Sequence, residues 1–147
     1  MLVLQFLFKK IGYNSWIYKE GQNRDVYVLE TLANFLDFKF NPLDLKHHTE
    51  QIGYIRGFFD AEGGIPHRKE NKFYIQLVQK DKAKLLKIKR ILKNLGVNMG
   101  VIHNPSKKVD PEYWRMYVLT NSHIRFVDVV GTWHPVKDKI FRERMKI

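Results

Sequence analysis

Residues 52–64, IGYIRGFFDAEGG, decide how the rest of the sequence is interpreted. Their apolar residues predict a buried helix over 49–63, although Gly53 and Gly57 each cost about 1 kcal/mol relative to alanine inside a helix. These glycines and Ala61 recur four apart, so they form one stripe on the helix surface. A stripe without side chains lets a second backbone approach closely. The pattern favours a helix–helix contact, and a glycine-tolerant helix packed on a sheet is the alternative.

The same stretch ends in two acids. Asp60 and Glu62 fall in the last helical turn, where exposed carbonyls carry partial negative charge and disfavour anions. Gly63 and Gly64 then predict a left-handed helix end. A hard divalent cation such as Mg²⁺, which binds carboxylate, carbonyl and water oxygens, would explain acids in this position. Solvation of both carboxylates, or ion pairs with nearby lysines, is the alternative explanation.

The charge of the chain indicates its class of partner. The formal net charge is +11, and the basic residues are spread from Lys9 to Lys146 over 147 residues. A folded body with such a surface attracts polyanions, of which nucleic acid is the first candidate. A lysine-rich surface that only keeps the protein in solution is the alternative.

Composition excludes several classes of function. The 44% hydrophobic content is enough for one domain with a real core. No cysteine is present, which excludes disulfides, zinc–thiolate sites and a cysteine nucleophile. No apolar run reaches the roughly 18–20 residues of a membrane span, and the apolar start lacks a cleavage pattern of small residues. These observations predict an intracellular protein of the cytoplasm or an organelle matrix.

Periodicity predicts the elements that follow the motif. The clearest helix covers 81–96, with Asp81 as its cap and Gly96 as its stop. Alternation predicts a half-buried strand over 72–79, paired in a hairpin with 65–69. Further elements are expected as strands over 97–103 and 113–120 around a turn-rich 104–112, a short helix over 122–131 capped near Asn121 or Ser122, and a basic helix over 134–147.

The beginning of the chain repeats its end. Three segments match in the same order: Phe8–Asn14 with Leu92–Asn98, Tyr27–Phe38 with Tyr117–Asp128, and Phe40–Lys46 with Trp133–Lys139. We interpret residues 1–46 as the rear part of a repeat that lacks its helix and first hairpin, and residues 47–147 as a complete unit.

The segment Ile55–Gly63, IRGFFDAEG, resembles the signature of the LAGLIDADG homing endonucleases. It is identical to that motif at Gly57, Asp60, Ala61 and Gly63, and the order of the predicted elements downstream is similar too. The resemblance implies an α+β fold, an αββαββα unit with a curved antiparallel DNA-binding sheet. It also implies a site-specific DNA endonuclease of the kind associated with introns or inteins, which hydrolyses phosphodiester bonds.

The resemblance further assigns roles around the motif. It implies a site for Mg²⁺ or Mn²⁺ in which Glu62 is the ligand and catalytic acid, with Gly63 and Asp60 beside it. Lys137 matches the basic residue of the family's active site, with Lys139 as the second choice. Gln76 matches a polar strand residue that positions water. Taken alone, Lys137 is one of many lysines, and Gln76 could be the solvated face of a strand.

DNA binding is expected from polar and basic side chains on the two predicted hairpins, because such side chains reach bases and phosphates in the major groove. The candidates are His67, Arg68, Lys69, Lys72, Tyr74, Lys107, Lys108 and Arg115.

The chain carries only one motif, whereas the family uses two motif helices packed through their small residues. The resemblance therefore implies a homodimer joined at Gly53 and Gly57, or association with a second LAGLIDADG half. A non-cleaving nucleic-acid-binding protein on the same fold, such as a maturase or a DNA-binding regulator, is the alternative function. A degenerate relic without activity is a further one.

Overall fold

The structure is a computed structural model that describes residues 1–23, 25–36 and 39–145. The chain forms two compact units, Met1–Phe40 and Asn41–Ile147, and each is described by itself. The second unit therefore begins earlier than the residue 47 expected from the sequence. The reason is the short 3-10 helix η1 (Pro42–Asp44), which packs against helix α3 (Lys82–Asn94) of the second unit.

The first unit is a helix followed by a β-hairpin. Helix α1 (Leu2–Lys10) is followed by strands β1 (Ser15–Glu20) and β2 (Val26–Thr31), which pair antiparallel with Ser15 opposite Thr31. No residue of α1 is buried, although most of the helix is apolar. The last two residues of the repeat segment Tyr27–Phe38 lie outside the described residues.

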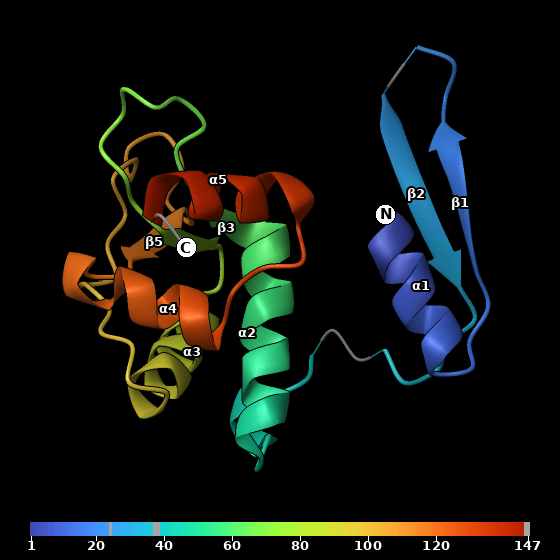
Figure 1. The fold of residues 1–147 in the computed structure, drawn as a ribbon, viewed down its shortest axis with the longest axis horizontal. Coiled ribbons are helices and arrows are strands. Elements are labelled where there is room, and N and C mark those ends of the chain that lie inside the picture. The colour runs from blue at the N-terminus through green and yellow to red at the C-terminus, as the bar shows by residue number, and fades with distance from the viewer. Residues whose placement is uncertain (24, 37–38, 146–147) are drawn as a thin grey trace. The chain divides into compact units, whose positions relative to one another are not determined.

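The second unit is built around the motif helix. Helix α2 (His48–Glu62) runs directly into strand β3 (Gly63–Gly64) (Figure 1). This strand opens an antiparallel sheet in the order β3, β4 (Gln76–Gln79), β5 (Trp114–Tyr117). Helix α3 follows β4 in the chain, and β5 is followed by η2 (Thr120–Ser122), α4 (His123–Val129) and α5 (Pro135–Met145). Two single bridges, at Met99 and His103, add the segment before β5 to the sheet. This order confirms the α+β fold expected from the sequence.

The core lies between α2, the other helices and one face of the sheet. Ile55 and Phe59 of α2 are fully buried, and the Phe59 ring lies 5.1 Å from that of Phe126 on α4 and 5.8 Å from that of Phe141 on α5. In β4 and β5 the inward residues alternate with outward ones, as the alternation over 72–79 predicts. Burial of these large side chains fixes the end of α2 against α4 and α5 (Figure 1).

The helices follow their sequence signals closely. The Asp81 carboxylate accepts hydrogen bonds from the backbone N–H groups of Ala83 and Lys84, and α3 stops before Gly96, whose φ is +77°. The helices expected over 122–131 and 134–147 are present as α4 and α5, and residues 146–147 lie outside the described part. Ser122 is the N-cap of α4, but its hydroxyl accepts instead from the backbone N–H of Asn98.

The strands are shorter than predicted. Residues 65–69 form no strand, 72–79 is a strand only from Gln76, and 97–103 makes only single bridges. The hairpin is present with shorter strands, because β3 and β4 pair only at Gly63 and Gly64. In the loop between them, the guanidinium of Arg144 on α5 donates to the carbonyls of Arg68, Lys69 and Asn71. These carbonyls are bound by a side chain, so the segment is a loop fixed by α5. Among the described residues, no helix is long and apolar enough to cross a membrane.

Candidate catalytic and DNA-binding site

The last turn of α2 is held by a loop from much later in the chain. The half-buried Asp60 carboxylate accepts hydrogen bonds from the Thr132 hydroxyl and, at 2.9 Å, from the backbone N–H of Trp133. The Thr132 oxygen in turn accepts from the backbone N–H of His134 at 3.0 Å. Both oxygens of Asp60 therefore have protein partners, which fix the loop against α2 and limit what else this carboxylate can bind.

Glu62 has different surroundings. It is exposed at the end of α2, and the structure shows no hydrogen bond or ion pair to its carboxylate from the residues that it describes. An exposed carboxylate without protein partners keeps its lone pairs available for a cation. Of the two acids in the motif, Glu62 is the one that can bind a ligand from outside the chain.

Lys137 caps the negative end of α2. Its ammonium donates to the carbonyls of Phe59 at 2.6 Å, Asp60 at 3.0 Å and Gly63 at 2.8 Å. Burial lowers the pKa of Lys137, while the negative charges of Asp60 and Glu62 act to raise it. A cation bound to these carbonyls compensates the helix dipole, so the helix end tolerates its two acids. Lys139 instead lies 4.0 Å from Glu143 on the same helix.

The two glycines after α2 serve close packing and not a left-handed turn, so that prediction was wrong. Gly63 has φ −84° and ψ 147°, which is extended backbone. A Cβ on Gly63 would overlap the side chain and carbonyl of Phe59, and one on Gly64 would lie 2.6 Å from Nε2 of Gln76. The Gln76 side chain therefore lies over Gly64, next to the end of the motif helix.

The small-residue stripe of α2 is open. A Cβ added at Gly53 or Gly57 would meet no atom of the described chain within 4 Å, and Gly57 and Ala61 are exposed. Within the described part of the chain, no close contact therefore requires glycine at either position.

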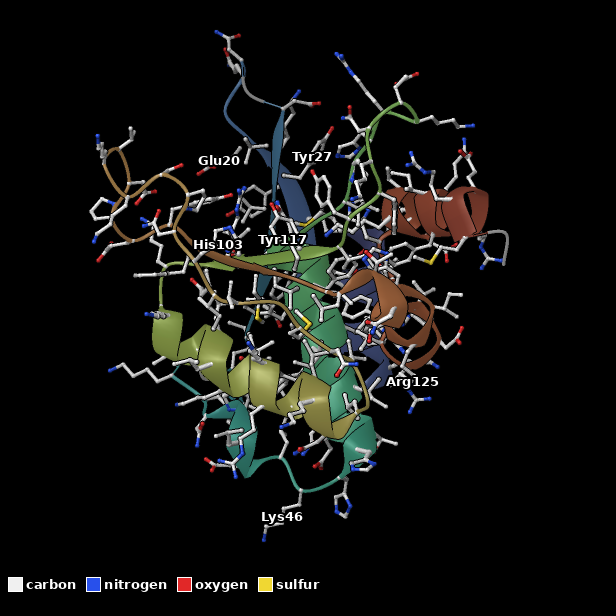
Figure 2. The ribbon with its side chains drawn as sticks, turned by 90° about the vertical axis from the view of Figure 1, so that its left-hand side faces the viewer. Glu20, Tyr27, Lys46, His103, Tyr117 and Arg125 are labelled. Atoms are coloured by element: carbon white, nitrogen blue, oxygen red, sulfur yellow. The ribbon has the colours of Figure 1, made fainter. Side chains whose placement is uncertain are left out.

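The outward face of the sheet carries a cluster of aromatic and basic side chains. Arg115 of β5 donates from Nε to Nε2 of His103 at 3.2 Å, and its guanidinium lies 5.3 Å from the Tyr117 ring. The Tyr117 ring stacks on His103 at 5.9 Å and meets the edge of Tyr74 at 5.8 Å. Figure 2 shows His103 and Tyr117 next to each other at the sheet. His103 is not among the residues expected from the sequence, although it lies in a predicted strand beside the one that carries Arg115.

The remaining basic candidates lie in loops. His67, Arg68, Lys69 and Lys72 are exposed in the segment between β3 and β4, where Lys69 also pairs with Glu143 at 3.2 Å. Lys107 and Lys108 are exposed in the turn over 104–112. The Asn104 side chain shapes that turn by donating to the carbonyls of Asp110 and Pro111, both at 2.9 Å.

The oxygen donors suit a hard divalent cation, but their number is small. Within the described residues, no three His, Asp or Glu side chains are grouped so that they could hold a metal ion together. Glu62 has a carboxylate to offer, whereas the Gly63 carbonyl already accepts from Lys137. The donors present at one helix end are therefore a partial ligand set.

The comparisons with known proteins agree with this architecture. Residues 49–131, more than half of the chain, match the family model described as a LAGLIDADG-like domain. No curated protein sequence matches the chain.

Solved structures of I-DmoI are among those that the chain resembles. A complex of I-DmoI with DNA and manganese has 27% identity and a TM-score of 0.64 over 88% of this chain and 71% of that one. A variant of I-DmoI with its target DNA in the presence of magnesium has 27% identity and a TM-score of 0.63 over 88% and 70%. Mesophilic variants of the homing endonuclease I-DmoI reach a TM-score of 0.68 over 97% and 74%, and at 24% identity this likeness concerns the fold alone.

The motif helix with its acid pair, the antiparallel sheet that follows it and the family match over 49–131 support one conclusion. This chain belongs to the LAGLIDADG homing endonuclease family.

Proposed function

We propose that the protein is a site-specific DNA endonuclease that hydrolyses phosphodiester bonds with Mg²⁺ or Mn²⁺. The observation that carries this proposal is Glu62, an exposed carboxylate without hydrogen-bond or ion-pair partners among the described residues, near the half-buried ammonium of Lys137. A structural acid would be expected to have protein partners, as Asp60 does. The complexes of I-DmoI with DNA and with manganese or magnesium support the same reaction class.

The side chains at the end of α2 have distinct roles in this proposal. Glu62 holds the metal, which when bound lowers the pKa of a water and stabilises charge on the scissile phosphate. Gln76, which lies over Gly64, orients a water through its amide. Lys137 keeps the helix end neutral and offers positive charge near the phosphate. Asp60 keeps the loop over 131–134 in place and so positions Lys137.

The site needs a second carboxylate from outside this helix. One chain provides the Glu62 carboxylate. Its described residues contain no group of three acidic or histidine side chains that could hold a metal ion. The open stripe of Gly53, Gly57 and Ala61 gives a second motif helix room to approach. We propose that this helix comes from a second copy of the chain or from a separate LAGLIDADG half, and that it brings its own acid to Glu62.

DNA binding is proposed for the outward face of the sheet and the loops at its ends. Arg115 is held by His103 and by the Tyr117 ring, so its remaining N–H groups have a fixed direction. A fixed guanidinium suits bidentate contact with the O6 and N7 acceptors of guanine. The exposed basic candidates in the loops, His67, Arg68, Lys69, Lys72, Lys107 and Lys108, would contact phosphates.

A plasmid library of candidate sites, incubated with the protein and Mg²⁺, tests the reaction. We expect defined products from the wild type and a loss of rate of about 100-fold or more for Glu62→Gln, as for other groups that act at the reacting atoms. Glu20→Gln is the matched control, because Glu20 is an exposed acid of the first unit. Equal products from all three proteins, or none from the wild type, would overturn the proposal.

A non-cleaving DNA- or RNA-binding protein is the second candidate function. It is favoured by the carbonyl of Gly63, which accepts from Lys137, and by the partial ligand set. In that case the library is bound with similar affinity by the wild type and Glu62→Gln and is cut by neither. Binding that needs neither Mg²⁺ nor Glu62 distinguishes this function from the endonuclease.

A further inference from the structure

The first unit repeats the end of helix α3 in atomic detail. In α1 the N–H of Tyr13 donates to the carbonyl of Phe8 at 2.9 Å, after Gly12 with φ +85°. In α3 the N–H of Val97 donates to the carbonyl of Leu92 at 2.9 Å, after Gly96 with φ +77°. Both helices therefore end in the same Schellman motif at residues that the sequence repeat aligns.

The aligned apolar residues differ sharply in exposure. The same alignment pairs Leu4 with Ile88 and Ile11 with Leu95. Leu4 is 48% exposed and Ile11 56%, whereas Ile88 and Leu95 are 0% and 5% exposed. The core face of α3 is thus present in α1 as an apolar surface that its own unit leaves uncovered.

The hairpin shows the same difference. Alignment of Tyr27 with Tyr117 pairs Val26, which is 45% exposed, with the fully buried Met116 of β5. In the second unit β4 covers the edge of β5, with Gln76 opposite Tyr117. In the first unit the described sheet has only β1 and β2, so one edge of β2 has no strand beside it.

The second unit shows which elements cover the equivalent residues. There α2 and β4 supply Ile55, Phe59 and Leu77 to the core that buries α3 and β5. We propose that the first unit binds a segment equivalent to residues 47–79, a helix with large apolar residues at the positions of Ile55 and Phe59, followed by a strand that pairs with β2 at Tyr27. This surface consists of the exposed Leu4 and Ile11 and the half-buried Phe8 on α1, and of the free edge of β2.

Helix α2 of a folded copy is not available as the occupant. Ile55 and Phe59 are completely buried in the second unit, so a second folded copy cannot lend its α2 without unfolding. The proposal specifies where a second half would bind, and it rests on the proposed function for its biological purpose. Its test measures binding and amide protection, so it can fail or succeed independently of DNA cleavage.

The test adds a synthetic peptide with the sequence of residues 47–79 to the full chain and follows amide hydrogen exchange. We expect one peptide to bind per chain and to slow exchange in α1 and β2 by a factor of about 1 + [peptide]/Kd. A peptide carrying Ile55→Asp and Phe59→Asp should not bind, because charged residues cannot occupy the apolar surface.

A pair of chain variants checks the surface itself. Leu4→Asp should abolish the protection, whereas Leu2→Asp should keep it. Leu2 is the matched control, because it is 77% exposed and its counterpart Leu86 is also exposed, at 53%. Three results would overturn the proposal. The peptide could protect only the second unit, both variants could lose the protection equally, or the chain without peptide could gain protection as its concentration rises.

Discussion

At the scale of single residues, the two acids of the motif helix have different tasks. Asp60 is bound by Thr132 and Trp133 and contributes to the fold, whereas the Glu62 carboxylate has no partner among the described residues. Removal of the Glu62 charge therefore leaves no buried group unpaired. The Glu62→Gln variant should keep the stability of the wild type, so that its loss of cleavage reports on chemistry and not on folding.

His123 is predicted to make the fold sensitive to acid. Its ring is buried, with Nε2 3.1 Å from the Val118 carbonyl and the Phe73 ring at 5.3 Å. Desolvation lowers the pKa of His123 below 6.5, and the hydrogen bond to Val118 opposes this shift. The unfolded chain then binds more protons than the native one between the lowered pKa and 6.5. We expect the contribution of His123 to the free energy of unfolding to be fully present above pH 6.5. It should be lost as the pH falls through this window.

Urea denaturation between pH 4.5 and 7.5 would measure that dependence. His123→Gln keeps a donor for the Val118 carbonyl and should show a smaller loss of stability on acidification than the wild type. His67→Gln is the matched control, because His67 is exposed in the loop between β3 and β4. An acid dependence that His123→Gln leaves unchanged would contradict the prediction.

At the scale of elements, α2 depends on α5 for the end that carries its acids. Lys137→Met keeps the length of the side chain but removes the donor from the carbonyls of Phe59, Asp60 and Gly63. We expect this change to lower the free energy of unfolding by about 1–3 kcal/mol, because partly buried carbonyls lose a charged donor. Chemical denaturation with a fluorescence or circular dichroism signal would give the difference.

Lys139→Met on the same helix is the control for that prediction. Lys139 is exposed and has only a 4.0 Å ion pair with Glu143, so its change should stay within about 0.5 kcal/mol. Equal effects of the two substitutions would mean that the cap on α2 does not stabilise the protein.

The helices could be predicted from the sequence, and the strands only in part. The cap at Asp81 and the stop at Gly96 are local signals, so α3 appears almost where its sequence places it. The strand predicted over 65–69 is instead part of the loop between β3 and β4, where the Arg144 guanidinium binds the carbonyls of Arg68, Lys69 and Asn71. No local pattern contains that contact, since its partners are more than 70 residues apart in the chain. The extended backbone conformation of Gly63 likewise depends on its contact with Phe59, which no sequence pattern shows.

At the scale of the whole molecule, the net charge of +11 predicts binding to DNA that is strongly sensitive to salt. The logarithm of the binding constant should fall linearly with the logarithm of salt concentration, by about 0.9 for each phosphate contacted. Replacing both Lys107 and Lys108 with alanine should reduce the magnitude of this slope by about 1.8. Fluorescence anisotropy with a labelled duplex at several salt concentrations would measure it.

The control has the same change in charge on a different element. Arg90→Ala with Lys93→Ala removes two exposed positive charges from α3, and the salt slope should stay close to that of the wild type. A similar reduction in both double variants would place the DNA elsewhere or indicate binding without a preferred face.

The candidate site was also predictable only in part. The motif identified the acids at the end of α2, and the family resemblance selected Glu62, Gln76 and Lys137. The sequence could not tell that Lys137 caps the helix or that Asp60 is occupied, because both facts depend on contacts between distant segments. His103 escaped notice for the same reason, since it matters through its bond to Arg115.

The loop that binds Asp60 has a consequence for the order in which the protein is made. Its hydrogen bonds join residue 60 to residues 132 and 133, and Lys137 and Phe141 follow still later. During synthesis the helix with the acids leaves the ribosome well before the residues that fix its end. Because contacts of high sequence separation form late, this end of the molecule is completed last. A nascent chain can therefore fold its sheet and α3 while the candidate nuclease site is still unformed.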